Sequence, residues 1–317
     1  MSLFKRDLED FLLYCELTKQ YSFNTVRNYR NTLGRFSAFL DKMKVEQTNM
    51  IDLDLVNGYR QYLNKKDTIR KDKMSLKAQA YQIVVLRSFL KFMVRSGVVV
   101  LNPDSLELPK TRMRRIEYLN DKEVHQLINS ILNDTNKIPA VTKKRNQAII
   151  LTLFGSGLRL SELLKIKKME VHDDNDQLII DGKGGKIRST YLAPAAKEAI
   201  LEYLELRGED VCPFLFVSFS KSRKQNPAKW KPLTPRMVQM MLQSYANRLG
   251  IYKHITPHTL RHSFATKILS EGGDLRSVQT LLGHSSISTT QIYTHITDWQ
   301  IKDLHSRVFG TKKTSKN

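Results

Sequence analysis

The sequence contains side chains that suit the transfer of a phosphate group. His258 and Arg261 lie three residues apart, in a segment where Thr256 and Pro257 fit the cap and first turn of a helix. This spacing places the two side chains on one helix face. A guanidinium binds two phosphate oxygens with a fixed fork of donors, and an imidazole exchanges protons near neutral pH. By itself, however, the pattern more often marks a solvated surface pair.

Arg159 offers a second guanidinium in a different setting. It follows the glycine-rich residues 155–157 and begins an apolar helical segment, with Glu162 three residues later. The carboxylate can hold the guanidinium in place, although an ordinary ion pair has the same spacing. Lys183 lies with Lys186 on a glycine-rich turn, where solvated lysines are common, and the spacing of a Walker loop is absent.

A tyrosine follows further along the chain. One helix is expected to end at Gly283, which places His284 just beyond it, and Ser288 can cap the next helix, which carries Tyr293. A tyrosine on a short helix usually packs in a core or on a surface. Tyr293 alone therefore indicates no chemistry.

A zinc site is the main alternative use of the histidines, since His258 and His262 have the spacing of a zinc-binding pair. Thr259 occupies the position where the metalloprotease motif requires glutamate, and no third ligand is evident. Cys15 and Cys212 are far apart and suggest neither a disulfide nor a zinc site. With no phosphate-binding loop or magnesium-type carboxylate cluster, we expect neither a metal nor another cofactor.

The first hundred residues show the periodicity of helices. An apolar stripe runs through Thr25–Met43, with Asn24 as a plausible cap. A second stripe ends at Gly97, a residue suited to the left-handed position after a helix. The stripe residues are Ile83, Leu86, Leu90 and Met93, and shorter helices are expected over Leu3–Thr18 and Leu55–Leu63.

Prolines and basic residues then interrupt the pattern. Pro103, Pro109 and the arginines that follow predict a linker over residues 102–116, after an N-terminal domain of residues 1–101. Asn120 with Glu123 has the spacing of a capping box, so a second domain is expected over residues 117–317. In it, glycines between Leu178–Asp181 and Ile187–Leu192 predict a hairpin. Helices are expected to resume at Ala195, Thr234, Thr256 and Asp274.

The charge points to a polyanionic partner. The net charge is +21, of which +10 lies in residues 1–116 and +11 in residues 117–317. Two basic globular halves suggest a clamp around a nucleic acid duplex rather than an accessory tail. No apolar run approaches a membrane span and the first residues are charged, so a cytoplasmic protein is expected.

Together, these segments resemble the motifs of the tyrosine recombinase (phage integrase) family, especially its Xer-like members. The resemblance extends to the N-terminal half, where Asn24 to Leu40 and Ala80 to Pro103 are similar to the core-binding domain. The matching motifs are Gly-Leu-Arg-Leu-Ser-Glu-Leu at 157–163, Gly-Lys-Gly-Gly-Lys at 182–186, His-Thr-Leu-Arg-His-Ser-Phe-Ala-Thr at 258–266, Leu-Leu-Gly-His-Ser-Ser at 281–286 and Ile-Tyr-Thr-His at 292–295.

The resemblance implies a mainly α fold with two domains. The first is an N-terminal helical core-binding (SAM-like) domain, and the second is a mostly helical catalytic domain with a small β-hairpin. It also implies that Tyr293 attacks DNA and forms a 3′-phosphotyrosine. The implied catalytic set is Arg159, Lys183, His258, Arg261, His284 and Tyr293, with Glu162 and His262 supporting their neighbours.

The implied partner is a double-stranded DNA recombination site. Family members act as tetramers that exchange strands through a Holliday junction, and the segment Trp299 to Val308 resembles their C-terminal exchange helix. A homo-tetramer or a hetero-tetramer and an accessory activator are all compatible with the resemblance, as are chromosome dimer resolution and mobile-element integration or excision. Two alternatives remain open at this point, a type IB topoisomerase and a DNA-binding regulator without catalysis.

Overall fold

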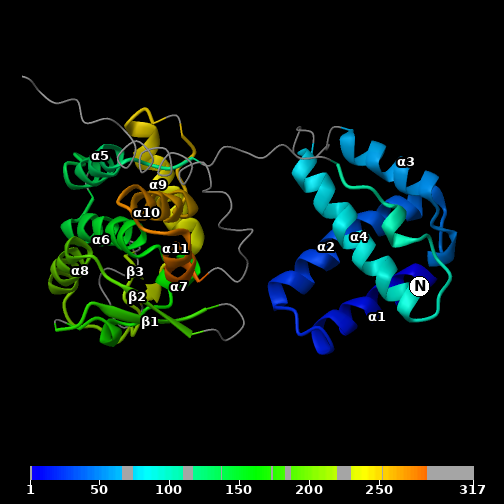
Figure 1. Cartoon of the computed structure of the whole chain (residues 1–317), viewed down its shortest axis with the longest axis horizontal. Helices are drawn as coiled ribbons and strands as arrows, with labels where there is room; N and C mark the ends of the chain where they lie inside the picture. The colour runs from blue at the N-terminus through cyan, green and yellow to red at the C-terminus, as the bar shows by residue number, and fades with distance from the viewer. Residues whose placement is uncertain are drawn as a thin grey trace, which may run out of the picture. The chain divides into compact units, whose positions relative to one another are not determined.

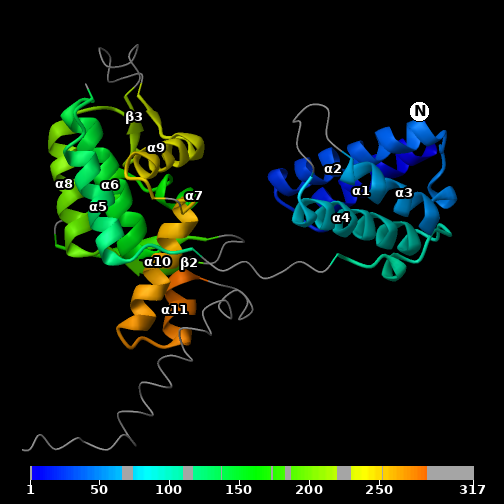
Figure 2. The same cartoon turned by 90° about the horizontal axis from the view of Figure 1, so that it is seen from above.

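The computed structural model of the protein divides into two compact units, Met1–Arg114 and Arg115–Asn317. Among the residues that the structure describes, each unit has an apolar core of its own. The fold is mainly α-helical, as predicted (Figures 1 and 2). The structure describes residues 2–65, 74–109, 117–136, 138–172, 174–182, 187–219, 230–251 and 253–283. Among the helices in these ranges, none has the length and apolar character needed to cross a membrane.

The described residues of the first unit form four α-helices around an aromatic core. Phe4 and Phe89 meet edge to face with ring centroids 5.3 Å apart, and Phe36 meets Tyr59 at 4.8 Å. Rings arranged in this way contribute attraction beyond the burial of their area. The helices are α1 (Leu3–Leu17), α2 (Phe23–Met43), α3 (Leu53–Asn64) and α4 (Leu76–Arg95), with a 3-10 turn at Thr48–Met50.

Capping residues and backbone conformation at the helix termini determine where these helices begin and end. Helix α2 begins earlier than predicted, because Ser22 and not Asn24 is the cap: its hydroxyl accepts a hydrogen bond from the backbone N–H of Thr25 at 3.4 Å. Helix α4 ends as predicted, with Gly97 in the left-handed region (φ 79°) just after it.

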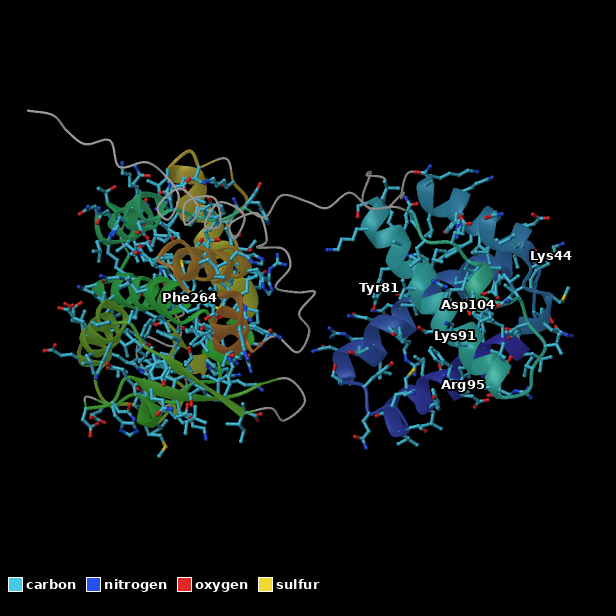
Figure 3. The ribbon with its side chains drawn as sticks, in the orientation of Figure 1. Lys44, Tyr81, Lys91, Arg95, Asp104 and Phe264 are labelled. Atoms are coloured by element: carbon cyan, nitrogen blue, oxygen red, sulfur yellow. The ribbon has the colours of Figure 1, made fainter. Side chains whose placement is uncertain are left out.

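Part of the predicted linker packs on the first unit. Pro103 and Leu106 are buried, and Pro103–Ser105 forms a 3-10 turn. Asp104 and Lys91 lie side by side on the surface (Figure 3), with Oδ1 and Nζ 3.0 Å apart. The chain is therefore attached to this unit as far as Leu106, inside the predicted linker of residues 102–116.

Helix α6 (Ala140–Ser156) is the centre of the second unit. It packs against α5, α8 and α10, and its residues Ile149, Ile150 and Leu153 are fully buried. Residues 148–154 of this helix are apolar except for Thr152, as expected of a segment in such a central place. The surrounding helices are α5 (Asp121–Leu132), α8 (Pro194–Arg207), α9 (Pro235–Arg248) and α10 (Pro257–Ser270). The capping box of Asn120 and Glu123 is confirmed at the start of α5.

The described part of this unit also contains two small antiparallel sheets. Strands β1 (Gln177–Asp181) and β2 (Ile187–Tyr191) form the predicted hairpin, with Ile179 opposite Ser189. Its side chains alternate, so that Leu178 and Thr190 are buried while Ile179 is exposed. The second sheet pairs β3 (Val217–Ser218) with β4 (Lys231–Pro232) and was not predicted.

Helices α10 and α11 (Leu275–Leu282) form a separate apolar cluster beside the main core. The two helices lie next to each other in both views (Figures 1 and 2). Phe264, labelled in Figure 3, packs in this cluster with Leu269, Val278 and Leu282. The cluster fixes the end of α11 against α10, which carries the predicted histidine and arginine.

Candidate catalytic site

A glycine at the end of α6 positions Arg159. Gly157 has φ 62°, and a Cβ there would lie 2.4 Å from the ring of Phe264 and 2.9 Å from Leu282. Only a glycine lets the backbone turn this close to α10 and α11. Two residues later, Arg159 is the N-terminal cap residue of the short helix α7 (Leu160–Leu163).

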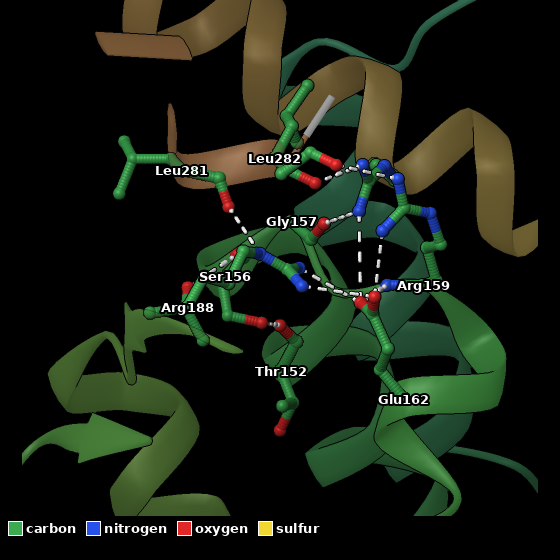
Figure 4. Close-up of polar contacts among 11 residues, drawn as sticks. Thr152, Ser156, Gly157, Arg159, Glu162, Arg188, Leu281 and Leu282 are labelled. Atoms are coloured by element: carbon green, nitrogen blue, oxygen red, sulfur yellow. Dashed lines mark hydrogen bonds and ion pairs between the residues drawn. The ribbon is translucent and has the colours of Figure 1, made fainter. Parts of the chain in front are cut away.

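Glu162 holds Arg159 at this helix start, as predicted. Its carboxylate accepts hydrogen bonds from Nη1 and from the backbone N–H of Arg159, both at 2.8 Å (Figure 4). Burial acts to raise the pKa of Glu162, but hydrogen bonds from Arg188 and Arg159 outweigh it and lower the pKa below its usual value. The carboxylate is therefore charged at neutral pH. The Arg159 side chain is 30% exposed and so remains accessible to solvent.

Arg261 is buried, so the alternative of a solvated surface pair with His258 is wrong. Its Nη1 donates to the carbonyl of Gly157 and its Nη2 to that of Leu282, both at 2.6 Å. Nη1 also lies 4.0 Å from Glu162 Oε2. The guanidinium groups of Arg159 and Arg261 thus both lie beside the carboxylate of Glu162.

His258 is exposed in the first turn of α10, on the Arg261 side. Its pKa is lowered by partial loss of hydration and by the positive charges of Arg261 and Arg159. The imidazole is therefore neutral at pH 7 and can accept a proton. His262, one turn later and partly buried, has a pKa lowered to about 4, first by burial and then by its proximity to His258 and Arg261.

The structure brings three predicted site residues together, Arg159, His258 and Arg261. Helix α11 ends at Gly283 in the left-handed conformation, as predicted, so His284 is the next residue in the chain. In the part of the chain that the structure describes, no group of three histidine, cysteine or acidic side chains can hold a metal ion. The other predicted site residues lie outside the described residues: Lys183, His284 and Tyr293.

Arg188 on β2 is a site residue that the sequence analysis missed. It forms two parallel hydrogen bonds to Glu162, from Nη1 at 3.0 Å and from Nη2 at 2.9 Å (Figure 4). The strand period could have revealed it, because Arg188 has the inward register of Thr190 in the hairpin. An arginine on the inner side of a strand requires a buried acceptor.

The sequence matches two protein families, one in each half of the chain. Residues 117–299 match the phage integrase family, and residues 8–97 match the phage integrase N-terminal SAM-like domain. Tyrosine recombinase XerC of Anoxybacillus flavithermus is 33% identical over 90% of this chain and 92% of the relative. Tyrosine recombinase XerD of Staphylococcus saprophyticus is 32% identical over 94% of this chain and 97% of the relative.

The fold is also that of a solved recombinase structure. XerH site-specific recombinase bound to palindromic difH substrate superposes with a TM-score of 0.69 at 21% identity, covering 94% of this chain and 84% of that one. The chain belongs to the phage integrase family of tyrosine recombinases, enzymes that break and rejoin DNA in site-specific recombination. These relatives do not favour the topoisomerase or the non-catalytic regulator that the sequence left open.

Proposed function

We propose that Arg159 and Arg261 bind the nonbridging oxygens of one scissile phosphate during recombination. The observation that carries this proposal is their convergence on Glu162, which sets two guanidinium groups side by side next to the exposed His258. Negative charge grows on these oxygens as a nucleophile attacks phosphorus, so fixed cationic donors lower the barrier directly. His284, the residue after α11, would add a hydrogen bond to the same phosphate.

Tyr293 is the nucleophile in this proposal. Its hydroxyl oxygen forms a bond to phosphorus while the bond to the 5′ oxygen breaks, and its proton passes to His258. The lowered pKa of His258 supports this role, because it keeps a free nitrogen lone pair at neutral pH. Lys183 protonates the departing 5′ oxygen. The 3′-phosphotyrosine ester conserves the energy of the broken bond, so rejoining needs no nucleotide cofactor.

The substrate in this proposal is a double-stranded DNA site held by a tetramer, either of this chain alone or with a second recombinase, with or without an accessory activator. Residues 1–101 form the core-binding domain, residues 102–116 the linker and residues 117–317 the catalytic domain with its exchange helix. The net charge of +21, positive in both halves, supports DNA as the partner. The reaction would take place in the cytoplasm and would resolve chromosome dimers or move a mobile element.

Covalent trapping tests this proposal. The target site is first selected from genomic fragments by affinity, and a nicked suicide duplex carrying that site is incubated with the protein and run on a denaturing gel. Wild type should form a protein–DNA adduct, and Tyr293→Phe should bind the same DNA without forming it. An adduct of equal yield in Tyr293→Phe, or none with wild type on a bound site, would refute the proposal.

A second assay concerns recombination between sites. A plasmid carrying two copies of the selected site should yield two circles with wild-type protein alone if a homo-tetramer suffices. Relaxation of a plasmid that lacks the site would instead favour a topoisomerase.

A further inference from the structure

The C-terminus of α11 is held by three arginines from three different elements. Arg188 Nε donates to the carbonyl of Leu281 at 3.1 Å, Arg261 Nη2 to that of Leu282 at 2.6 Å, and Arg159 Nη2 to that of Gly283 at 3.1 Å. The last carbonyls of a helix lack partners within it and carry partial negative charge, which favours cations. Figure 4 shows the contact of Arg188 with Leu281, close to the Glu162 carboxylate.

Arg188 differs from the other two arginines in the groups that it binds. Its side chain is 11% exposed, against 30% for Arg159, and its bonds go to the Glu162 carboxylate and the Leu281 carbonyl. Arg261 is less exposed still, at 5%, but its Nη atoms are bonded to the neutral carbonyls of Gly157 and Leu282. In Arg188 both Nη atoms are bonded to a carboxylate, which neutralises the guanidinium charge and competes with a phosphate for it. Arg188 therefore acts on protein groups.

By compensating the negative charge of Glu162, Arg188 also weakens the attraction of Glu162 for Arg159 and Arg261. Glu162 is 6% exposed, and each of its oxygens accepts one bond from Arg188. Without Arg188, the buried carboxylate keeps its full charge with half the compensation. It would then pull Arg261 in from 4.0 Å, away from a phosphate.

The stem of Arg188 lies directly against the end of α11. A Cβ added at Gly283 would lie 2.7 Å from Arg188 Cδ, and Gly283 has φ 63°. Glycine is therefore required at the residue that precedes His284. Arg188 lies five positions after Lys183, the predicted general acid, and contacts the end of α11, which precedes the segment of Tyr293. One side chain therefore connects the two segments.

We propose that Arg188 is a positioning residue for strand cleavage, which fixes Glu162 and the end of α11 so that Arg159 and Arg261 face one phosphate. This inference rests on the proposed function. It assigns Arg188 no contact with DNA. Its loss should therefore slow the chemical step on bound DNA while leaving DNA affinity almost unchanged.

The test measures two quantities for each variant, the Kd for the selected site and the single-turnover rate of adduct formation at saturating protein. Arg188→Met should lower the rate about 10- to 100-fold, since a shift of about 1 Å in a catalytic group has an effect of this size. The Kd should change less than threefold, roughly the effect expected where no phosphate contact is lost. Arg188→Lys should be intermediate, because an ammonium cannot form two parallel bonds.

Two further variants separate positioning from a general effect on folding. Ser189→Ala, on the same strand with its hydroxyl bonded to Gln177 at the exposed face, is the control and should match wild type in both quantities. Glu162→Gln in the Arg188→Met background removes the uncompensated charge and should cleave faster than Arg188→Met alone. Single-turnover rates do not depend on the fraction of folded protein, so this partial rescue reports on the site.

The outcomes distinguish this inference from the proposed function. If wild type forms an adduct and Arg188→Met forms it at the same rate, the positioning role of Arg188 is wrong while the proposed function stands. A weaker Kd with an unchanged rate would make Arg188 a DNA contact and would also overturn the inference. If Arg188→Met does not fold, the cleavage rates of Arg188→Lys and of the double variant Glu162→Gln with Arg188→Met are compared with the wild-type rate. Rates equal to wild type for both variants would overturn the inference. Absence of an adduct with wild type refutes the proposed function itself.

Discussion

At the scale of single residues, the site depends on one buried carboxylate. Glu162 has two guanidinium groups bonded to it and a third at 4.0 Å, so its charge is compensated although it is removed from water. Arg159 and Arg261 are held before any phosphate arrives. Such preorganisation avoids rearrangement during the reaction, when negative charge develops on the phosphate oxygens.

The lowered pKa of His258 predicts how the cleavage rate depends on pH. Neutral His258 accepts the proton of Tyr293, so the cleavage rate should fall as pH drops through the pKa of His258 and stay flat above it. Because this pKa lies below 6.5, wild type should lose less than half of its rate between pH 7.5 and 6.5. The rate should be measured at DNA concentrations below the Kd, which reports the free enzyme.

The matched variant for this prediction is His258→Gln. It should cleave about 10²- to 10⁴-fold more slowly, the usual contribution of a general base, and its rate should lack the wild-type fall at low pH. A wild-type midpoint at pH 7 or above, or the same acid fall in His258→Gln, would show that another group accepts the proton.

At the scale of elements, the close packing of α6, α10 and α11 depends on Gly157. Gly157→Ala introduces a left-handed alanine and a methyl group 2.4 Å from the Phe264 ring, so it should destabilise the protein by about 3 kcal/mol. Gly250→Ala is the control, since Gly250 also has φ 64° but no atom within 4 Å of an added Cβ. It should cost about 1 kcal/mol.

Chemical denaturation followed by circular dichroism measures both values. Equal losses for Gly157→Ala and Gly250→Ala would mean that the close approach to Phe264 and Leu282 adds nothing. Gly157→Ala should in addition lower the rate of adduct formation, because the carbonyl of Gly157 accepts a hydrogen bond from Arg261.

The elements that the sequence predicted well have strong local signals. These signals are the capping box of Asn120 and Glu123 and the helix ends at Gly97 and Gly283. They depend on hydrogen bonds and backbone conformation within a few residues. The start of α2 was misplaced because Ser22 and Asn24 are both good caps, and only the actual bond to Thr25 decides between them.

What the sequence did not predict depends on distant partners. The pairing of β3 with β4 joins two segments of two residues each, too short for any periodicity. Arg188 was missed because its partners Glu162 and Leu281 lie 26 and 93 positions away in the sequence. The three described catalytic candidates were found from motif resemblance. Glu162, the common neighbour of Arg159 and Arg261, could be linked from the sequence only to Arg159.

At the scale of the whole molecule, positive charge in both halves predicts a strongly salt-dependent interaction with DNA. The net charge is +21, and cationic groups that neutralise phosphates release bound counterions. The affinity for the selected site should fall on the order of 10³-fold between 50 and 200 mM salt, with log Kd linear in log salt concentration. Fluorescence anisotropy with a labelled duplex measures it.

Arg188→Met serves as the control in this titration, because it should leave the salt slope unchanged if Arg188 contacts no phosphate. A wild-type affinity that is insensitive to salt would contradict a DNA interface built mainly on lysine and arginine.

The central claim is that Tyr293 becomes bonded to DNA, and identifying the bonded residue tests it most directly. The covalent adduct on suicide DNA is digested with nuclease and protease, and the peptides are analysed by mass spectrometry. We predict a nucleotide attached through its 3′ phosphate to Tyr293 and to no other residue. A nucleotide on a different side chain, or one attached through a 5′ phosphate, would contradict the account.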